Sequence, residues 1–161
     1  FAKTGPEIRE AQFMTLARTT NTAMAVITDY GDADDIHPAR KEPVGQRLEL
    51  AARVLAYGHN LEYSGPLFKK AHFNGSSVTI SFTHCGMGLF AKGGSLKGFT
   101  IAGADKKFVP AKAEIKDNTV VVSSPEVISP VAVHYGWENV PDVNLFNAAG
   151  LPASPFRSDV E

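Results

Sequence analysis

The hydrophobic periodicity of the chain changes at Tyr63–Pro66, and this change constrains the fold more than any other feature of the sequence. Before it, apolar residues recur at helical spacing in two segments. After it, apolar and polar residues alternate as they do in strands with one buried face. We therefore expect an α/β segment over residues 1–62 and an all-β domain over residues 63–161.

The first 62 residues predict one strand between two helices. Gly5–Glu7 begins the first helix, because proline suits the first helical position and an acid suits the first turn, and Asn21 ends it. The run Thr22–Thr28 is apolar on both faces, as in a strand of a parallel sheet covered by helices. Pro43 begins the second helix and Gly58 ends it.

The second helix is predicted to bury one apolar stripe, with Arg47 and Arg53 facing solvent. A single strand cannot make a sheet, so residues 1–62 are interpreted as the last part of an α/β sheet domain. The predicted stripe consists of Val44, Leu48, Ala51, Ala52 and Leu55.

The segment after residue 63 predicts an antiparallel β-sandwich. Asn74-Gly75, the strongest short hairpin turn, lies between the runs Leu67–Phe73 and Ser77–Thr83. Short strands separated by turn residues at this spacing are typical of a sandwich. Further strands are predicted over Phe99–Ala102, Phe108–Lys116, Thr119–Ser123 and Val131–Tyr135.

An acidic loop with one histidine, Asp29–Pro38, follows the predicted strand. In α/β proteins, reactive groups gather at the carboxyl ends of strands. A carboxylate three positions before a histidine can orient the imidazole and stabilise its charge, so that it serves as a general base. The spacing therefore indicates His37 and Asp34 as a candidate base and acid. The alternative is a solvated acidic loop.

Other classes of site are excluded by composition and spacing. The net charge is −1, with 16 Lys+Arg against 17 Asp+Glu, and no apolar run reaches the length of a membrane span. The histidines and the single Cys85 lack zinc spacing, and Ile36 and Pro43 occupy positions where a calcium loop needs oxygen ligands. We expect no metal, no cofactor, no nucleic-acid partner and no membrane partner.

A nucleophile to accompany His37 is missing from the sequence. There is no Gly-x-Ser-x-Gly elbow, and no serine lies on a strand-to-helix turn. His84 and Cys85 are neighbours in a strand-like run, so their side chains point to opposite faces, and Cys85 is interpreted as a packed residue. The rest of any catalytic site is therefore expected outside this chain.

Several motifs, in order along essentially the whole chain, resemble one family. The most specific is Gly-Asp-x-x-Asp-Ile-His-Pro-x-x-Lys-x-x-Val-Gly-x-Arg-Leu, from Gly31 to Leu48. Together they resemble the sialate O-acetylesterase-like family of SGNH-type carbohydrate esterases. The others are Ile8–Gln12, Gly98–Asp105, Val122–Pro125, Pro130–Val133, Asn144–Asn147 and Gly150–Arg157.

The resemblance implies a flavodoxin-like α/β hydrolase domain with β-sandwich additions, which removes O-acetyl groups from sialic acids or plant polysaccharides. His37 is then the catalytic base, acting on a serine near the start of the hydrolase domain. The general pattern Asp-x-x-His selects Asp34 as the acid, whereas the Asp-Ile-His-Pro form marks Asp35. Spacing favours Asp34, and Asp29 and Asp32 are reserves in the same loop.

The family's serine, glycine and asparagine blocks do not occur in this sequence. The resemblance thus implies a carboxy-terminal portion, cleaved or cut from a longer polypeptide, which acts with an amino-terminal chain or segment bearing the serine. Sugar-degrading relatives imply a secreted or periplasmic location, or a lysosomal one in a eukaryote. The alternative is a carbohydrate-binding or accessory β-domain without catalysis. If Trp137 and Tyr135 are exposed, they are candidates for sugar stacking, and the other interpretation, above all for Trp137, is a role in the core or between domains.

Overall fold

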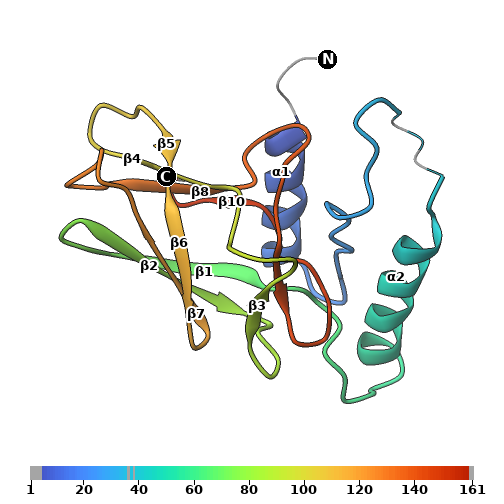
Figure 1. Ribbon diagram of the computed structural model, residues 1–161. Helices are drawn as coiled ribbons and strands as arrows, with labels where there is room; N and C mark the ends of the chain where they lie inside the picture. Colours follow the sequence, from blue (N-terminus) through green and yellow to red (C-terminus); the bar gives the residue numbers. More distant parts are fainter. Residues whose placement is uncertain (1–4, 36, 38, 160–161) are drawn as a thin grey trace.

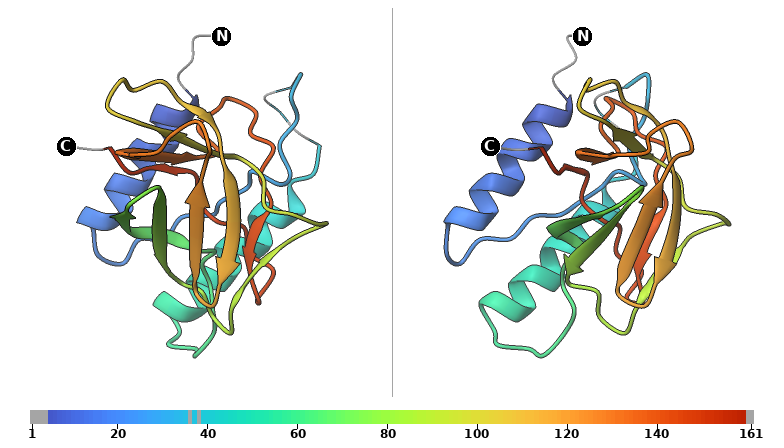
Figure 2. Two further views of the ribbon diagram at one scale, coloured as in Figure 1. Left: turned by 60° about the vertical axis from the view of Figure 1, so that its left-hand side comes forward. Right: turned by 90° about the vertical axis from the view of Figure 1, so that its left-hand side faces the viewer.

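A computed structural model describes residues 5–35, 37 and 39–159 of the chain. Two helices, α1 (Gly5–Arg18) and α2 (Glu42–Leu55), precede all the strands and lie to one side of them (Figures 1 and 2). Neither helix has the length and apolar character that crossing a membrane requires. The strands are β1 (Leu67–Asn74), β2 (Ser77–Thr83), β3 (Leu89–Ala91), β4 (Phe99–Ala102), β5 (Val109–Pro110), β6 (Lys112–Lys116), β7 (Thr119–Ser123), β8 (Ala132–Tyr135), β9 (Leu145–Asn147) and β10 (Phe156–Arg157).

The strands form two four-stranded sheets and one two-stranded sheet, in the orders β1-β2-β7-β6, β10-β8-β4-β5 and β3-β9. Every pairing described is antiparallel, which confirms the predicted strand type. The prediction of one strand over Phe108–Lys116 is wrong, because β5 and β6 belong to different sheets. Pro110 has no N–H to continue the ladder, the Ala111 N–H bonds to the Phe99 carbonyl, and the chain then crosses to β7.

One core of apolar side chains joins the two larger sheets. In β2, Val78, Ile80 and Phe82 face this core, and each such side chain contributes about 1.5–3 kcal/mol when fully buried. Tyr135 is fully buried there, and its hydroxyl accepts a hydrogen bond from the Leu145 N–H at 3.0 Å. Burial raises the pKa of Tyr135. Its suggested role in sugar stacking is therefore wrong.

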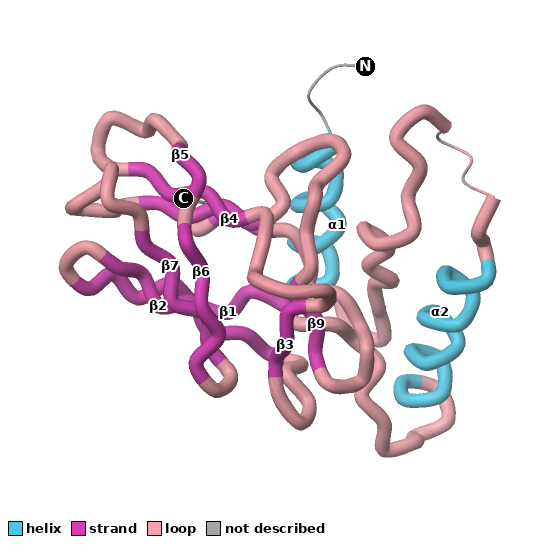
Figure 3. Tube along the Cα trace, viewed as in Figure 1, coloured by secondary structure: helices cyan, strands magenta, loops and turns pink. Residues whose placement is uncertain are grey.

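The predicted strand Thr22–Thr28 is also wrong. The segment is irregular and forms part of the long connection between the two helices (Figure 3). A strand requires a neighbour to satisfy its backbone groups, and no strand within the described ranges pairs with this segment. The flavodoxin-like sheet and the domain boundary at 62/63 consequently stay predictions.

Helix α2 buries a different face from the predicted one. Arg47, expected in solvent, is only 8% exposed, whereas Leu48 and Leu55 are 51% and 41% exposed. Pro43 and Ala51 lie on the buried face with Arg47, four residues on either side of it. The four-residue spacing of Pro43, Arg47 and Ala51 in the sequence places them on one face of a helix. That face was not predicted to be buried, because Arg47 is charged.

Segment Ser64–Pro66 attaches the helical region to the sheets at a buried junction. The Asn147 side chain donates to the Ser64 carbonyl and to the His84 carbonyl, each at 2.8 Å. At Gly65 the backbones approach so closely that a Cβ would lie 1.8 Å from the Pro152 carbonyl oxygen. Because the two backbones are in contact here, only glycine fits at this position.

We expect Gly65→Ala to lower the free energy of unfolding by about 3 kcal/mol, because the new methyl group must displace backbone. Gly45→Ala is the matched control. Gly45 lies inside α2 with open space around its would-be Cβ, so alanine there is expected to stabilise the protein by about 0.5–1 kcal/mol. Thermal unfolding measures both, and equal stabilities of the two variants would contradict the close approach at Gly65.

Candidate active site

The loop that carries His37 begins at a buried ion pair. Arg47 of α2 donates two hydrogen bonds to the two carboxylate oxygens of Asp29, each at 2.7 Å, and the side chains are 9% and 12% exposed. The same guanidinium donates to the Val26 carbonyl. Bidentate, buried pairs of this kind are geometrically specific. The first residue of the loop is thereby fixed against α2.

Tyr30 adds a second attachment for the loop. Its ring lies under two guanidinium groups, with the Arg40 carbon 4.5 Å and the Arg47 carbon 5.2 Å from the ring centroid. Cation–π contacts of this length are attractive. Because Arg40 precedes α2 and Tyr30 follows the ion pair, both ends of the loop are held together at its base.

His37 and Asp35 lie together at the exposed end of the loop. An oxygen of Asp35 accepts the backbone N–H of His37 at 2.7 Å and lies 3.5 Å from the imidazole Nδ1. The two side chains are 81% exposed for His37 and 59% for Asp35. Catalytic contacts are often long before substrate binds, so this distance is compatible with a base and its orienting carboxylate. Ile36 and Pro38 lie outside the described residues.

The other loop carboxylates have different partners. Asp32 accepts the backbone N–H of Asp34 at 2.9 Å, which shapes the turn, and Asp29 is committed to Arg47. Within the described hydrogen bonds and ion pairs, the Asp34 carboxylate makes no contact with His37. The structure thus brings Asp35 to His37 and leaves Asp34, the acid favoured by spacing, apart.

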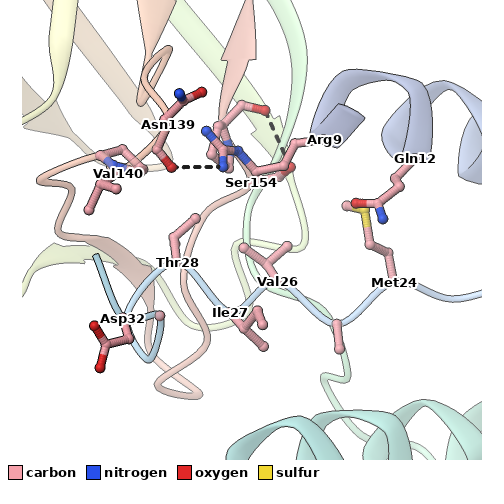
Figure 4. Close-up of a pocket in the computed structure, with 14 residues that line it drawn as sticks. Arg9, Gln12, Met24, Val26, Ile27, Thr28, Asp32, Asn139, Val140 and Ser154 are labelled. Carbon is pink, nitrogen blue, oxygen red and sulfur yellow. Dashed lines mark hydrogen bonds between the residues drawn. The ribbon is translucent and has the colours of Figure 1, made fainter. Parts of the chain in front are cut away.

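A pocket of about 250 Å³ adjoins the start of this loop (Figure 4). Its walls come from α1, from residues 24–28, from Gly31 and Asp32, and from residues 139–141 and 154–155. Val26 and Thr28 point toward Arg9 and Asn139, whereas Ile27 points to the opposite side. Burial lowers the pKa of Arg9, whose guanidinium donates to the Glu138 and Asn139 carbonyls.

The structure contains a second histidine–carboxylate pair that the sequence analysis did not predict. Glu62 and His84 approach to 2.8 Å and are 23% and 27% exposed. They are 22 positions apart, one before and one after the β1-β2 hairpin, so no local motif in the sequence indicates the pair. Cys85, interpreted as a packed residue, is indeed buried. In the described part of the chain, no group of three or more His, Cys, Asp or Glu side chains is arranged to hold a metal ion.

Sequence comparison finds relatives over most of the chain. It is 31% identical to mouse sialate O-acetylesterase and 33% identical to the human enzyme, over 87% and 84% of its own length. A crystal structure described as a novel carbohydrate acetylesterase from Xanthomonas citri matches 97% of the chain with 49% identity and a TM-score of 0.92. The chain belongs to the sialate O-acetylesterase-like family.

This membership confirms the resemblance recognised from the motifs. The chain spans 28% of the mouse relative, 29% of the human one and 36% of the crystallised chain. No protein-family model matches it. The relatives are about three times longer than this chain. The activity given in their names is therefore that of a longer protein.

We expect Arg47→Met to lower the free energy of unfolding by about 3–5 kcal/mol, because it leaves the buried Asp29 carboxylate without its partner. Arg53→Met is the matched control on the same helix. Arg53 pairs with Glu49 on the surface, with 41% and 57% of the side chains exposed, so its loss is expected to change stability by less than about 0.5 kcal/mol. Chemical denaturation measures both variants. Equal losses would show that the buried pair does not hold the loop.

Proposed function

We propose that this chain supplies the general base and its carboxylate to a serine-type carbohydrate O-acetylesterase. The observation that carries the proposal is the Asp35–His37 pair, exposed at the end of a loop whose base is fixed by the Arg47–Asp29 pair. Family membership supports the chemistry, since the named relatives are acetylesterases. The substrate class is an acetylated sugar, either a sialic acid or an acetylated polysaccharide.

In the proposed reaction, the imidazole of His37 takes the proton from a serine hydroxyl as that oxygen attacks the acetyl carbonyl carbon. The ester bond breaks, and the same proton passes to the departing sugar hydroxyl, leaving an acetyl-serine. His37 then deprotonates a water molecule that attacks the acetyl group, which releases acetate and restores the serine. Asp35 orients the imidazole and stabilises its positive charge, with Asp34 as the alternative residue for this task.

The serine of this proposal lies on a partner, an amino-terminal chain or segment of the same protein. The high exposure of His37 supports this arrangement, because an imidazole that is 81% exposed has room for a second surface against it. The pocket lined by Arg9, Thr28 and Asp32 adjoins the first residues of that loop and offers a place for the incoming segment or the acyl group. A secreted or periplasmic location, or a lysosomal one, remains part of the prediction.

The competing proposal is an accessory β-domain that binds carbohydrate without catalysis. The two proposals differ at His37, which an esterase requires and a binding module does not.

We expect His37→Ala, in the protein that includes the serine-bearing segment, to slow acetate release from an acetylated sugar by about 10³-fold or more. His72→Ala, which alters an exposed histidine of β1, is the control and should retain full activity. Retained activity in His37→Ala would exclude the proposed base.

The two candidate acids are separable by charge-neutral substitution. If Asp35 positions the base, Asp35→Asn is expected to lower kcat by about 10²-fold or more with little change in KM, because the orienting charge acts in the transition state. Asp34→Asn is then expected to stay within about threefold of the unaltered enzyme. The reverse ranking would assign the acid to Asp34 and would show that the loop rearranges when the partner binds.

A further inference from the structure

A groove of about 560 Å³ lies on the outer face of the β10-β8-β4-β5 sheet, apart from the pocket beside the His37 loop. Strand alternation explains its floor. Ile101 and Val133 are paired across β4 and β8 and face the core, so their neighbours Thr100 and His134, also paired, face outward. Residues 97 and 136–142 rise around this floor and form the walls.

Three rings pack together in this groove, and two of them, Phe108 and Trp137, are half-buried and accessible, whereas His134 is buried between them and the sheet. Phe108 stacks on His134 with ring centroids 3.8 Å apart, and Trp137 lies 5.3 Å from His134 at an angle of 48°. The Arg157 guanidinium holds Trp137 by a cation–π contact at 5.2 Å and is itself paired with Glu10 of α1 at 2.7 Å. The aromatic surface is thus fixed in position rather than free to rotate.

Polar side chains stand at the rim of the same groove. Lys97 and Asp142 pair across it at 3.0 Å and are 55% and 80% exposed, and Glu138 is exposed beside them. An aromatic floor with a few hydrogen-bonding groups at its edge is the chemistry that receives a sugar ring. The C–H face of the sugar packs on the rings, and its hydroxyls meet the rim.

The charges favour a neutral sugar over an acidic one. Lys97, which lines the groove, is paired with Asp142, and Arg157 beside Trp137 is paired with Glu10. The Arg9 guanidinium behind the wall is bonded to the Glu138 and Asn139 carbonyls. Burial lowers the pKa of His134, which also contacts Asp159 at 2.8 Å. Glu138 adds a further negative charge to the wall. A sugar carboxylate would meet net repulsion here.

We propose that this groove is a second sugar subsite, which holds one unit of a neutral glycan chain against Phe108 and Trp137. Pro141 lines both this groove and the pocket next to Asp32, so the two sites lie on opposite sides of one short loop. A glycan held in the groove is therefore directed toward the His37 loop, a consequence that rests on the proposed esterase function. The binding itself does not depend on that function.

The single tryptophan of the chain, Trp137, reports directly on this groove. Titration of the full chain with xylohexaose or mannohexaose, both without acetyl groups, is expected to give a saturable change in tryptophan emission. N-acetylneuraminic acid and a galacturonic acid oligomer are expected to give none. Because no ester is present, the result is independent of whether the chain takes part in ester hydrolysis.

Variants that retain Trp137 test the assignment. Phe108→Ala is expected to weaken the binding of the hexasaccharide by about tenfold, since it removes one of the two accessible rings. Phe73→Ala, which removes a 40% exposed ring from β1 in the other sheet, is the matched control and should bind as the unaltered chain does. If Phe108→Ala fails to fold, Asp142→Asn replaces it, with binding weakened severalfold.

Three outcomes would overturn the subsite. The first is the absence of any saturable change with both neutral hexasaccharides. The second is tighter binding of the acidic sugars than of the neutral ones. The third is unaltered affinity in folded Phe108→Ala or in Asp142→Asn, which would place the ligand elsewhere on the surface.

Discussion

The ion pair between Arg47 and Asp29 is the constraint on which the helical part of the molecule depends. Burying two charges is costly, and the cost is offset only where geometry and further hydrogen bonds are good. Both conditions hold here, because the contact is bidentate and the guanidinium also reaches the Val26 carbonyl. The pair attaches Val26 and Asp29 to α2, and it places Arg47 on the face of that helix that is turned inward.

The all-β part is held by different means. Its core is apolar, but the segments around that core are linked by hydrogen bonds from two buried asparagines, Asn144 and Asn147. Asn144 bonds to the carbonyls of Lys92 and Ser95 and to the Lys97 N–H, and Asn147 bonds to Ser64, His84 and Leu151. Each amide thus bonds to three backbone groups. The two asparagines thereby attach irregular segments to the sheets.

Local signals in the sequence were sufficient for much of this fold. The Asn74-Gly75 hairpin and the strand Thr119–Ser123 follow from turn chemistry and alternation, and the structure confirms them, as it confirms that a helix covers the segment after Gly5. The strand predicted at Thr22–Thr28 failed for a non-local reason. Composition indicates whether a segment is apolar, but only a neighbouring strand makes it part of a sheet.

For the candidate site too, the sequence predicted the features that depend on a local motif and missed those that depend on distant partners. The motif from Gly31 to Leu48 located His37 and its two acids, and the family assignment that it supported is confirmed. The role of Arg47 was missed because its partner is 18 positions away and its charge suggested solvent. Trp137 was named from the sequence as a candidate for sugar stacking, but its neighbours Phe108 and His134 were missed, since stacking between two loops and a strand leaves no periodic pattern. The roles of His37, Asp34 and Asp35 remain predictions.

The pairing of Glu10 with Arg157 has a consequence for the order in which the protein folds. These residues are 147 positions apart, so the contact between α1 and β10 joins the two ends of the described chain. Contacts between residues so distant in the sequence tend to slow folding. We therefore expect α1 to dock after the strands have paired, and Trp137, which Arg157 contacts, to reach its final position in the same step.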